Sequence, residues 1–346
     1  MTARRVGLRL SAVVLSTALA ILIGELGMRV AGLGDPVDGS DVIRAYAPAD
    51  PFEPDADPEI GHRLRANYAG EQVYTSSTTG IVVHRATTHT DARGLRAEST
   101  RTEGRVVVAV GDSTTFGVGV ADGESWPAAL ERRLDTSWRV VNAGVPGRNT
   151  AQEVRWFGQE ARSLHPDVAV LAFYINDLAP AIPVSGQLGD VVMPSPPWAS
   201  REGGLRRISR LYNLGWRTYE RRTLAAAVSG DGLSYVEALV QGGRVEDLYR
   251  EFERFAKTCR EVGARSAIAL LPVLDVADPR AADPLLAKAE AAAVSLGVPV
   301  LHAEHALDDF DIPERIVLPA ERHASVKANA RIAAVLHDEL RRVGLL

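Results

Sequence analysis

The chain has 346 residues, of which 46% are hydrophobic and 24% are charged, a balance typical of a globular protein and not of a disordered or fibrous one. Its net charge of -5 argues against general nucleic-acid binding, which needs a basic surface. The single cysteine, Cys259, excludes an internal disulfide framework and a Cys-rich zinc site.

The N-terminus has the features of a membrane signal. Three arginines within the first nine residues precede an uncharged apolar run over residues 10–24, an order typical of export signals. Ala18 and Ala20 would suit a cleavage site, but apolar residues continue beyond them. We therefore expect an uncleaved signal-anchor helix within residues 1–34. The early arginines predict that the helix crosses the cytoplasmic membrane once, with the N-terminus on the cytoplasmic side. The bulk of the chain would then lie outside, in the periplasm or the extracellular space.

Residues 35–104 are expected to form a linker and a small β-rich extension. The stretch over residues 47–58 is rich in Pro and Asp, as is typical of a linker. Short β-like patterns follow at residues 72–74 and 81–84. We expect this extension to pack on the domain that follows it.

From residue 105 to residue 346, buried-strand patterns alternate with helical ones. The strand patterns lie at residues 106–110, 138–143, 167–174, 265–271 and 298–301, and the helical patterns at residues 126–134, 149–164, 245–262, 284–296 and 325–343. This alternation predicts a three-layer α/β/α domain with a central, mostly parallel sheet. A Gly/Pro/Ser-rich loop and an Arg-rich helical stretch indicate an insertion at about residues 178–243.

Residues that could carry chemistry follow the predicted strands, where ligands bind in open α/β sheets. Gly111-Asp112-Ser113 follows the first strand, and a glycine-rich segment over residues 142–149 follows the second. Asn176 follows the third strand, and Glu321 and His323 precede the last helix. Together they supply a serine, an imidazole, an acid and hydrogen-bond donors, which are the parts that acyl transfer needs.

These parts predict a role for each residue. Ser113 would be the nucleophile, His323 would take its proton, and Glu321 could orient the imidazole. The Ser113 N–H, the Gly147 N–H and the Asn176 amide would stabilise the oxyanion. The other histidines show no metal-ligand spacing, so we expect no metal and no cofactor.

The arrangement resembles the SGNH hydrolase family, also called GDSL esterases. Ser113, Gly147, Asn176 and His323 occur in the family's order and spacing. The resemblance covers residues 105–346 apart from the insertion, and it implies the flavodoxin-like SGNH fold.

One departure from the family concerns the acid. Relatives usually carry Asp three residues before the histidine, sometimes two, whereas this chain has Ala320 at three and Glu321 at two. A serine–histidine dyad could also suffice. The segment over residues 91–96, Asp-Ala-Arg-Gly-Leu-Arg, is similar to an element that precedes the first strand in membrane-anchored bacterial relatives.

Three functions are open from the sequence. The first is a membrane-anchored, extracytoplasmic serine esterase acting on ester-linked acyl groups, with acetyl favoured. The second is an O-acyltransferase that passes the acyl group to an envelope or exported polysaccharide. The third is a non-catalytic envelope scaffold with the same fold. The expected partners are an ester or acylated-glycan substrate and the membrane, with no nucleic acid.

Overall fold

The structure is a computed structural model. It describes residues 3–33, 42–76, 80–178, 209–212, 214–215, 218, 245–274, 279–319 and 321–346. Apart from a few positions, the insertion expected at about residues 178–243 lies outside the described residues.

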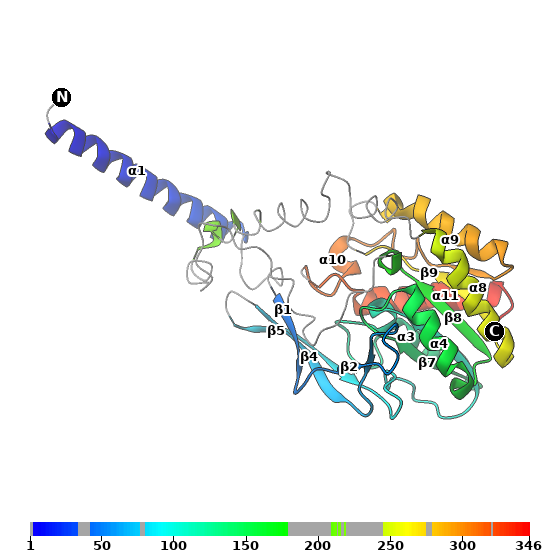
Figure 1. Ribbon diagram of the computed structural model, residues 1–346. Helices are drawn as coiled ribbons and strands as arrows, with labels where there is room; N and C mark the ends of the chain where they lie inside the picture. Colours follow the sequence, from blue (N-terminus) through cyan, green and yellow to red (C-terminus); the bar gives the residue numbers. More distant parts are fainter. Residues whose placement is uncertain are drawn as a thin grey trace.

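A five-stranded sheet forms the centre of the molecule (Figure 1). Its strands are β6 (Arg105–Gly111), β7 (Trp138–Gly144), β8 (Val168–Phe173), β9 (Arg265–Leu270) and β10 (Val300–His302). Their order is β10-β9-β8-β6-β7, and every neighbouring pair is parallel. The continuous apolar runs suit strands that are covered on both faces. The predicted mixed α/β fold with a mostly parallel sheet is confirmed.

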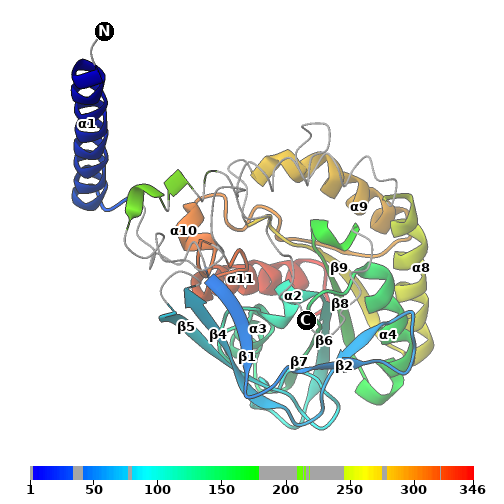
Figure 2. The ribbon, with the colours of Figure 1, turned by 60° about the vertical axis from the view of Figure 1, so that its left-hand side comes forward.

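Helices cover both faces of this sheet (Figures 1 and 2). The helices α4 (Thr150–Leu164), α8 (Val245–Val262) and α9 (Asp283–Ser295) pack on one face, and α3 (Trp126–Arg133) and α11 (Val326–Arg342) pack on the other. Alternate residues of β6 serve the two cores: Val108 belongs to the first and Val107 to the second.

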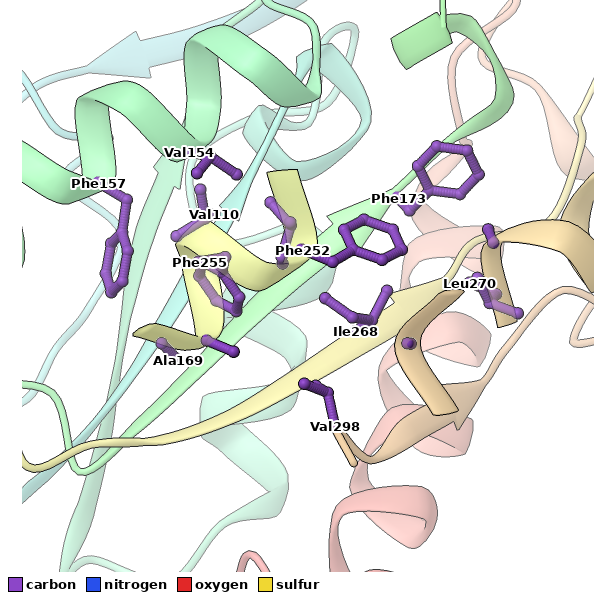
Figure 3. Close-up of a cluster of buried hydrophobic side chains, with 14 of the residues drawn as sticks. Val110, Val154, Phe157, Ala169, Phe173, Phe252, Phe255, Ile268, Leu270 and Val298 are labelled. Atoms are coloured by element: carbon purple, nitrogen blue, oxygen red, sulfur yellow. The ribbon is translucent and has the colours of Figure 1, made fainter. Parts of the chain in front are cut away.

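Four phenylalanines pack together with aliphatic side chains in the core under α4 and α8 (Figure 3). Phe157 of α4 and Phe255 of α8 have ring centroids 5.1 Å apart, and Phe252 meets Phe173 of β8 edge-on at 6.1 Å. All four side chains are fully buried. Burial of each side chain contributes roughly 1.5–3 kcal/mol to stability. This layer therefore holds α4 against the sheet, and with it the segment that leads into α4.

Four short helical turns connect the larger elements: α2 (Ser113–Phe116), η1 (Ile175–Leu178), η2 (Pro279–Ala282) and α10 (Ile312–Arg315). Helical periodicity does not reveal segments of four residues, so the sequence did not predict them. Three of the longer helices, α3, α4 and α11, begin at side-chain caps. Asn149 and Gln152 form a capping box at α4, and the Ser325 side chain caps α11.

The N-terminal extension contains two small antiparallel sheets. One has the order β1-β4-β5, with β1 (Val42–Ala47), β4 (Ala69–Ser76) and β5 (Val82–His89). The other pairs β2 (Phe52–Pro54) with β3 (His62–Leu64). In Figure 2 the sheet of β1, β4 and β5 lies at the side of the molecule where α10 and α11 meet.

The expectation of a linker at residues 47–58 is corrected by the structure. This stretch contains β2, and Phe52 is buried. Its aspartates do not mark solvated coil, because Asp50 and Asp55 each accept a hydrogen bond from the backbone N–H two residues further on. Such bonds shape tight turns, and these turns lead the chain into β2 and out of it.

The helix α1 (Ala3–Val30) projects from the α/β domain in both views (Figures 1 and 2), and Glu25 near its C-terminal end accepts hydrogen bonds from Ser209, Arg210 and Leu211. Its 22 residues over Arg9–Val30 are long and apolar enough to cross a membrane. An N-terminal signal sequence shares these properties. The expected apolar helix is therefore confirmed, whereas its retention and its orientation stay predictions.

Candidate active site

Ser113 opens the short helix α2 directly after the first central strand, β6. The helix packs tightly on the ends of β6 and β7. A Cβ on Gly111 would come within 2.2 Å of Thr115 Oγ1, and a Cβ on Gly144 would come within 2.2 Å of Phe116 N. The φ of Gly144 is not in the left-handed region, so it is the close approach of α2 that requires a glycine at this position.

His323 and Glu321 lie in the loop between α10 and α11. Two backbone hydrogen bonds close this loop: Val317 N donates to His323 O at 3.0 Å, and Glu321 N donates to Leu318 O at 2.9 Å. These bonds help to bring both side chains to the end of β6, where Ser113 lies.

The three side chains form a continuous chain of contacts. His323 Nε2 lies 2.8 Å from Ser113 Oγ, and His323 Nδ1 is hydrogen-bonded to Glu321 Oε1. Because an ionised carboxylate can only accept, we assign the ring proton to Nδ1. Nε2 then carries a lone pair and accepts the hydrogen bond from the serine hydroxyl. In this arrangement the imidazole can remove the serine proton.

Glu321 is buried, and its side chain is only 10% exposed. Burial by itself would raise the pKa of Glu321, but the interaction with His323, including its hydrogen bond, and the charge of Arg44 outweigh burial and bring the pKa to about 2. The Arg44 guanidinium donates to Glu321 Oε2 at 3.1 Å. The carboxylate is therefore ionised at neutral pH, with one oxygen facing the histidine and the other facing the arginine.

Asn176 lies in η1, at the end of β8, and its amide points to the same place. Asn176 Nδ2 donates to Asp112 Oδ2 at 3.1 Å, and the same carboxylate oxygen lies 3.2 Å from Ser113 Oγ. Asp112 Oδ1 accepts from Thr114 N at 2.8 Å, which caps α2. Asp112 thus joins the serine, the asparagine and the start of the helix.

Gly147 lies in the loop after β7 with a φ of +84°, a conformation that favours glycine. The loop is tied to the nucleophile strand because Val145 N donates to Gly111 O at 3.0 Å. Gly147 is half-buried at this end of the sheet. Among the described hydrogen bonds, none joins Gly147 itself to Ser113, His323, Glu321 or Asn176.

Residues of the N-terminal extension support the same loops. His62 Nε2 donates to Pro146 O at 2.8 Å, and Arg148 Nη2 returns a bond to His62 O at 2.7 Å. These bonds fix the backbone on either side of Gly147. The role of His62 is not predictable from the sequence, because no local pattern shows how the extension lies against this loop.

Arg96, the last residue of the segment singled out at residues 91–96, is buried behind α2. It donates to the carbonyl oxygens of Gly117 and Val120, both at 2.7 Å, and to that of Phe116. It also pairs with Glu98 at 3.1 Å. The Arg96 guanidinium thus donates hydrogen bonds to carbonyl groups at and just beyond the C-terminal end of the helix that begins with Ser113.

Two buried carboxyl groups lie next to Asp112. Burial raises the pKa of Glu153 in α4 well above its ordinary value, and the nearby charges of Asp177 and Asp112 act in the same direction. Burial and Asp112 likewise raise the pKa of Asp177, whose Oδ2 accepts from Tyr174 N at 2.9 Å. Both Glu153 oxygens are buried and have no hydrogen-bond partner among the described residues. This pair is not visible in the sequence, because a glutamate in the first turn of a helix is usually exposed to solvent.

The sequence also led us to expect no bound metal ion. Within the described residues, no three side chains of His, Cys, Asp or Glu are grouped so that they could hold a metal ion. The arrangement offers a hydroxyl, an imidazole, a carboxylate and amide donors, and these suit acyl transfer.

Comparison with known proteins gives a family and a set of similar folds. Residues 109–311 match the model of the GDSL-like lipase/acylhydrolase family. A comparison with curated proteins found no match. Similar solved structures include TesA, at 15% identity over 69% of this chain and 99% of that chain, with a TM-score of 0.44.

Two further similar structures are an esterase and an acetylesterase. The psychrotrophic esterase EstA from Pseudoalteromonas sp. is 13% identical over 69% of this chain and 98% of that chain, with a TM-score of 0.43. A carbohydrate acetylesterase family member from Sinorhizobium meliloti is 15% identical over 70% of this chain and 100% of that chain, with a TM-score of 0.41.

Proposed function

Because the chain belongs to the GDSL-like lipase/acylhydrolase family and is a serine ester hydrolase, we propose that it is a membrane-anchored esterase that cleaves ester-linked acyl groups outside the cytoplasm. The observation that carries the proposal is the contact of 2.8 Å between Ser113 Oγ and His323 Nε2, with Glu321 on the opposite ring nitrogen. A serine hydroxyl becomes a useful nucleophile only when a base can take its proton.

The first half of the reaction transfers the acyl group to the enzyme. Ser113 Oγ attacks the ester carbonyl carbon while His323 Nε2 accepts the hydroxyl proton. The carbonyl oxygen becomes an oxyanion, and the bond to the leaving oxygen then breaks. His323 returns the proton to that oxygen, so the alcohol leaves neutral and Ser113 carries the acyl ester.

Donors for the oxyanion come from three loops. We assign this role to the backbone N–H of Ser113, the backbone N–H of Gly147 and the Asn176 amide. Asn176 commits one amide hydrogen to Asp112, and its second hydrogen stays available for the substrate. Fixed donors of this kind stabilise the charge that develops in the transition state.

The second half of the reaction regenerates the enzyme. Water attacks the acyl carbon, and His323 Nε2 takes a proton from that water. The bond between Ser113 Oγ and the acyl carbon breaks, the carboxylic acid leaves, and the proton returns to Ser113. Throughout, the ionised Glu321 stabilises the imidazolium that forms at each transfer and holds the ring in place.

The test is turnover of a chromogenic acetate ester by the full chain in detergent micelles. We expect Ser113→Ala to abolish turnover and to prevent labelling by a fluorophosphonate. The matched control is Ser163→Ala, because in the described part of the chain the Ser163 hydroxyl bonds only to Glu160 of its own helix. Equal turnover and equal labelling of the Ser113→Ala and Ser163→Ala variants would overturn the assignment of the nucleophile.

The preference for acetyl groups is a separate part of the proposal. Chromogenic esters of increasing acyl length test it, and we expect the highest kcat/KM with the acetate. Adding an oligosaccharide acceptor should leave the rate of acetate release unchanged if water is the acceptor. Acylation of the oligosaccharide instead would assign the chain to the O-acyltransferases.

We further propose that α1 stays attached as the anchor, with the remainder of the chain outside the membrane. The support is the apolar stretch Arg9–Val30 and the arginines that precede it. The mass of the protein recovered from the membrane fraction should equal the full 37.2 kDa. A protease added to spheroplasts should digest the esterase domain, and protection of that domain would reverse the orientation.

A further inference from the structure

We propose that Arg44 is a positioning residue for Glu321 and His323, so that the first strand after the membrane helix forms part of the active site. This inference rests on the proposed function of that site. Its observation is the bond of 3.1 Å from Arg44 Nη1 to Glu321 Oε2, across 277 positions of the chain. The other carboxylate oxygen faces His323 Nδ1, so each oxygen has its own partner.

The position and length of the glutamate explain why a second partner matters. Glu321 stands two residues before His323, and its side chain has one more rotatable bond than an aspartate. Without a second anchor, the carboxylate could turn away from the imidazole. Arg44 and Glu321 are mostly buried, with side chains 19% and 10% exposed. The bond is thus shielded from water and holds the carboxylate in one rotamer.

The register of the small sheet directs Arg44 to this place. Inward-facing and exposed residues alternate along β1, and Arg44 is an inward-facing one. It pairs with Tyr74 of β4, which in turn pairs with His84 of β5. Directly paired residues share a face of the sheet, so these three side chains form one row across it.

The two ends of this row contact opposite sides of the proposed site. At one end Arg44 bonds to Glu321. At the other, His84 Nε2 donates to Gly119 O at 2.7 Å, in the loop that follows α2. Tyr74 lies between them, fully buried, and donates to Gln72 Oε1 at 3.2 Å. The sheet therefore spans the acid loop and the chain just beyond the nucleophile.

The surrounding charges keep the pair ionised. The titratable groups that face Glu321 are His323 from its own loop, Arg44 and Tyr46 from β1, and Tyr74 from β4. Burial opposes the charge on Arg44, but Tyr46 and Glu321 raise its pKa above the ordinary value. Removing the guanidinium leaves a less neutralised carboxylate beside His323. This change favours the imidazolium and moves the acidic limb of the kcat/KM profile to higher pH.

The primary test compares Arg44→Met with Arg85→Met in the full chain. Arg85 is a matched control, because it lies on the same sheet and forms a bond of 2.7 Å with Glu71 but is 54% exposed. For Arg44→Met we expect kcat to fall about 10- to 100-fold, with little change in KM and a shifted acidic limb. Arg85→Met should match the wild type in all three. Arg44→Lys keeps the charge without the planar fork and should recover part of the kcat.

A double-mutant cycle separates positioning from a merely structural role. If Arg44 acts through Glu321, adding Arg44→Met to Glu321→Gln should lower kcat little further. If Arg44 only stabilises the extension, the two effects should multiply and the pH profile should not move. Multiplied effects, or an Arg44→Met variant that behaves like Arg85→Met, would overturn the proposal.

A spectroscopic measurement keeps this inference distinct from the proposed function, because it needs no turnover. The proton on His323 Nδ1 should give a downfield 1H NMR signal, identified by its loss in His323→Gln. We expect the signal to shift or broaden in Arg44→Met and Arg44→Lys and to stay unchanged in Arg85→Met. An unchanged signal in both Arg44 variants would reject the positioning role, whatever the esterase assay shows.

Discussion

The Asn176 amide donates to the same Asp112 oxygen that lies 3.2 Å from Ser113 Oγ. One carboxylate therefore orients the proposed oxyanion donor relative to the proposed nucleophile. Since Asp112 also caps α2, its position is fixed by the fold and not by the substrate. The amide is held in place before an ester arrives, and this is the condition under which a hydrogen-bond donor accelerates the chemical step.

This relationship predicts the kinetic effect of losing the amide. Asn176→Ala should lower kcat about 100- to 1000-fold and change KM much less, because the lost bond forms mainly in the transition state. The measurement is steady-state hydrolysis of a chromogenic acetate ester. Fluorophosphonate labelling of Ser113 should slow in parallel. A rise in KM at constant kcat would instead assign Asn176 to ground-state binding.

The ionised Glu321 predicts a pH dependence of stability. Its pKa in the folded chain is about 2, below the ordinary value of 4.5. The stabilisation is therefore complete above pH 4.5 and is lost as the pH falls towards 2. The shift corresponds to on the order of 3 kcal/mol. Urea unfolding at several pH values should show the wild type losing this advantage over Glu321→Gln on acidification. A difference independent of pH would contradict the depressed pKa.

The buried Glu153 should make stability depend on pH in the opposite direction. Burial raises its pKa, so the folded state keeps the proton while the unfolded state releases it above its ordinary pKa of 4.5. The wild type should then lose stability relative to Glu153→Gln as the pH rises from 5 to 8, by up to about 1.4 kcal/mol per pH unit. Urea midpoints of the two proteins across this range test the sign, and parallel curves would show that Glu153 is ionised in the folded chain.

The buried Arg96 predicts a large loss of stability. Arg96→Met removes the donor to Gly117 and Val120 and takes the paired cation away from the buried Glu98, which keeps its hydrogen bonds from neutral donors. The free energy of unfolding should fall by about 3–5 kcal/mol. Arg93→Met is the matched control, because Arg93 pairs with Asp91 at the surface, and its loss should cost less than about 1 kcal/mol. Equal free energies of unfolding for the Arg96→Met and Arg93→Met variants would show that the buried pair contributes little to stability.

The central sheet was predictable because the information is local. The run Val106–Val110 is apolar at every position and is followed by glycine, which indicates a strand covered on both faces. The carboxyl ends of parallel strands meet at one edge, so residues that follow such strands can be expected to lie together. This reasoning identified Ser113 and Asn176, whose roles stay predictions.

The acid was harder to predict from local information. The sequence offered Glu321, or a dyad with no acid at all. The structure brings Glu321 to the Nδ1 of His323. What decides this is the backbone bonding of the loop, from Val317 to His323. Loop closure of this kind leaves no periodic pattern in the sequence.

The sequence by itself determined the alternation of strands and helices, the apolar N-terminal helix and the order of the polar residues along the chain, because periodicity and turn chemistry are properties of neighbouring residues. Only the tertiary structure decided that Arg44 meets Glu321, that His62 meets Pro146, and that the Pro- and Asp-rich stretch is folded. Those contacts depend on strand register and on packing between distant segments, and either can change without altering any local pattern.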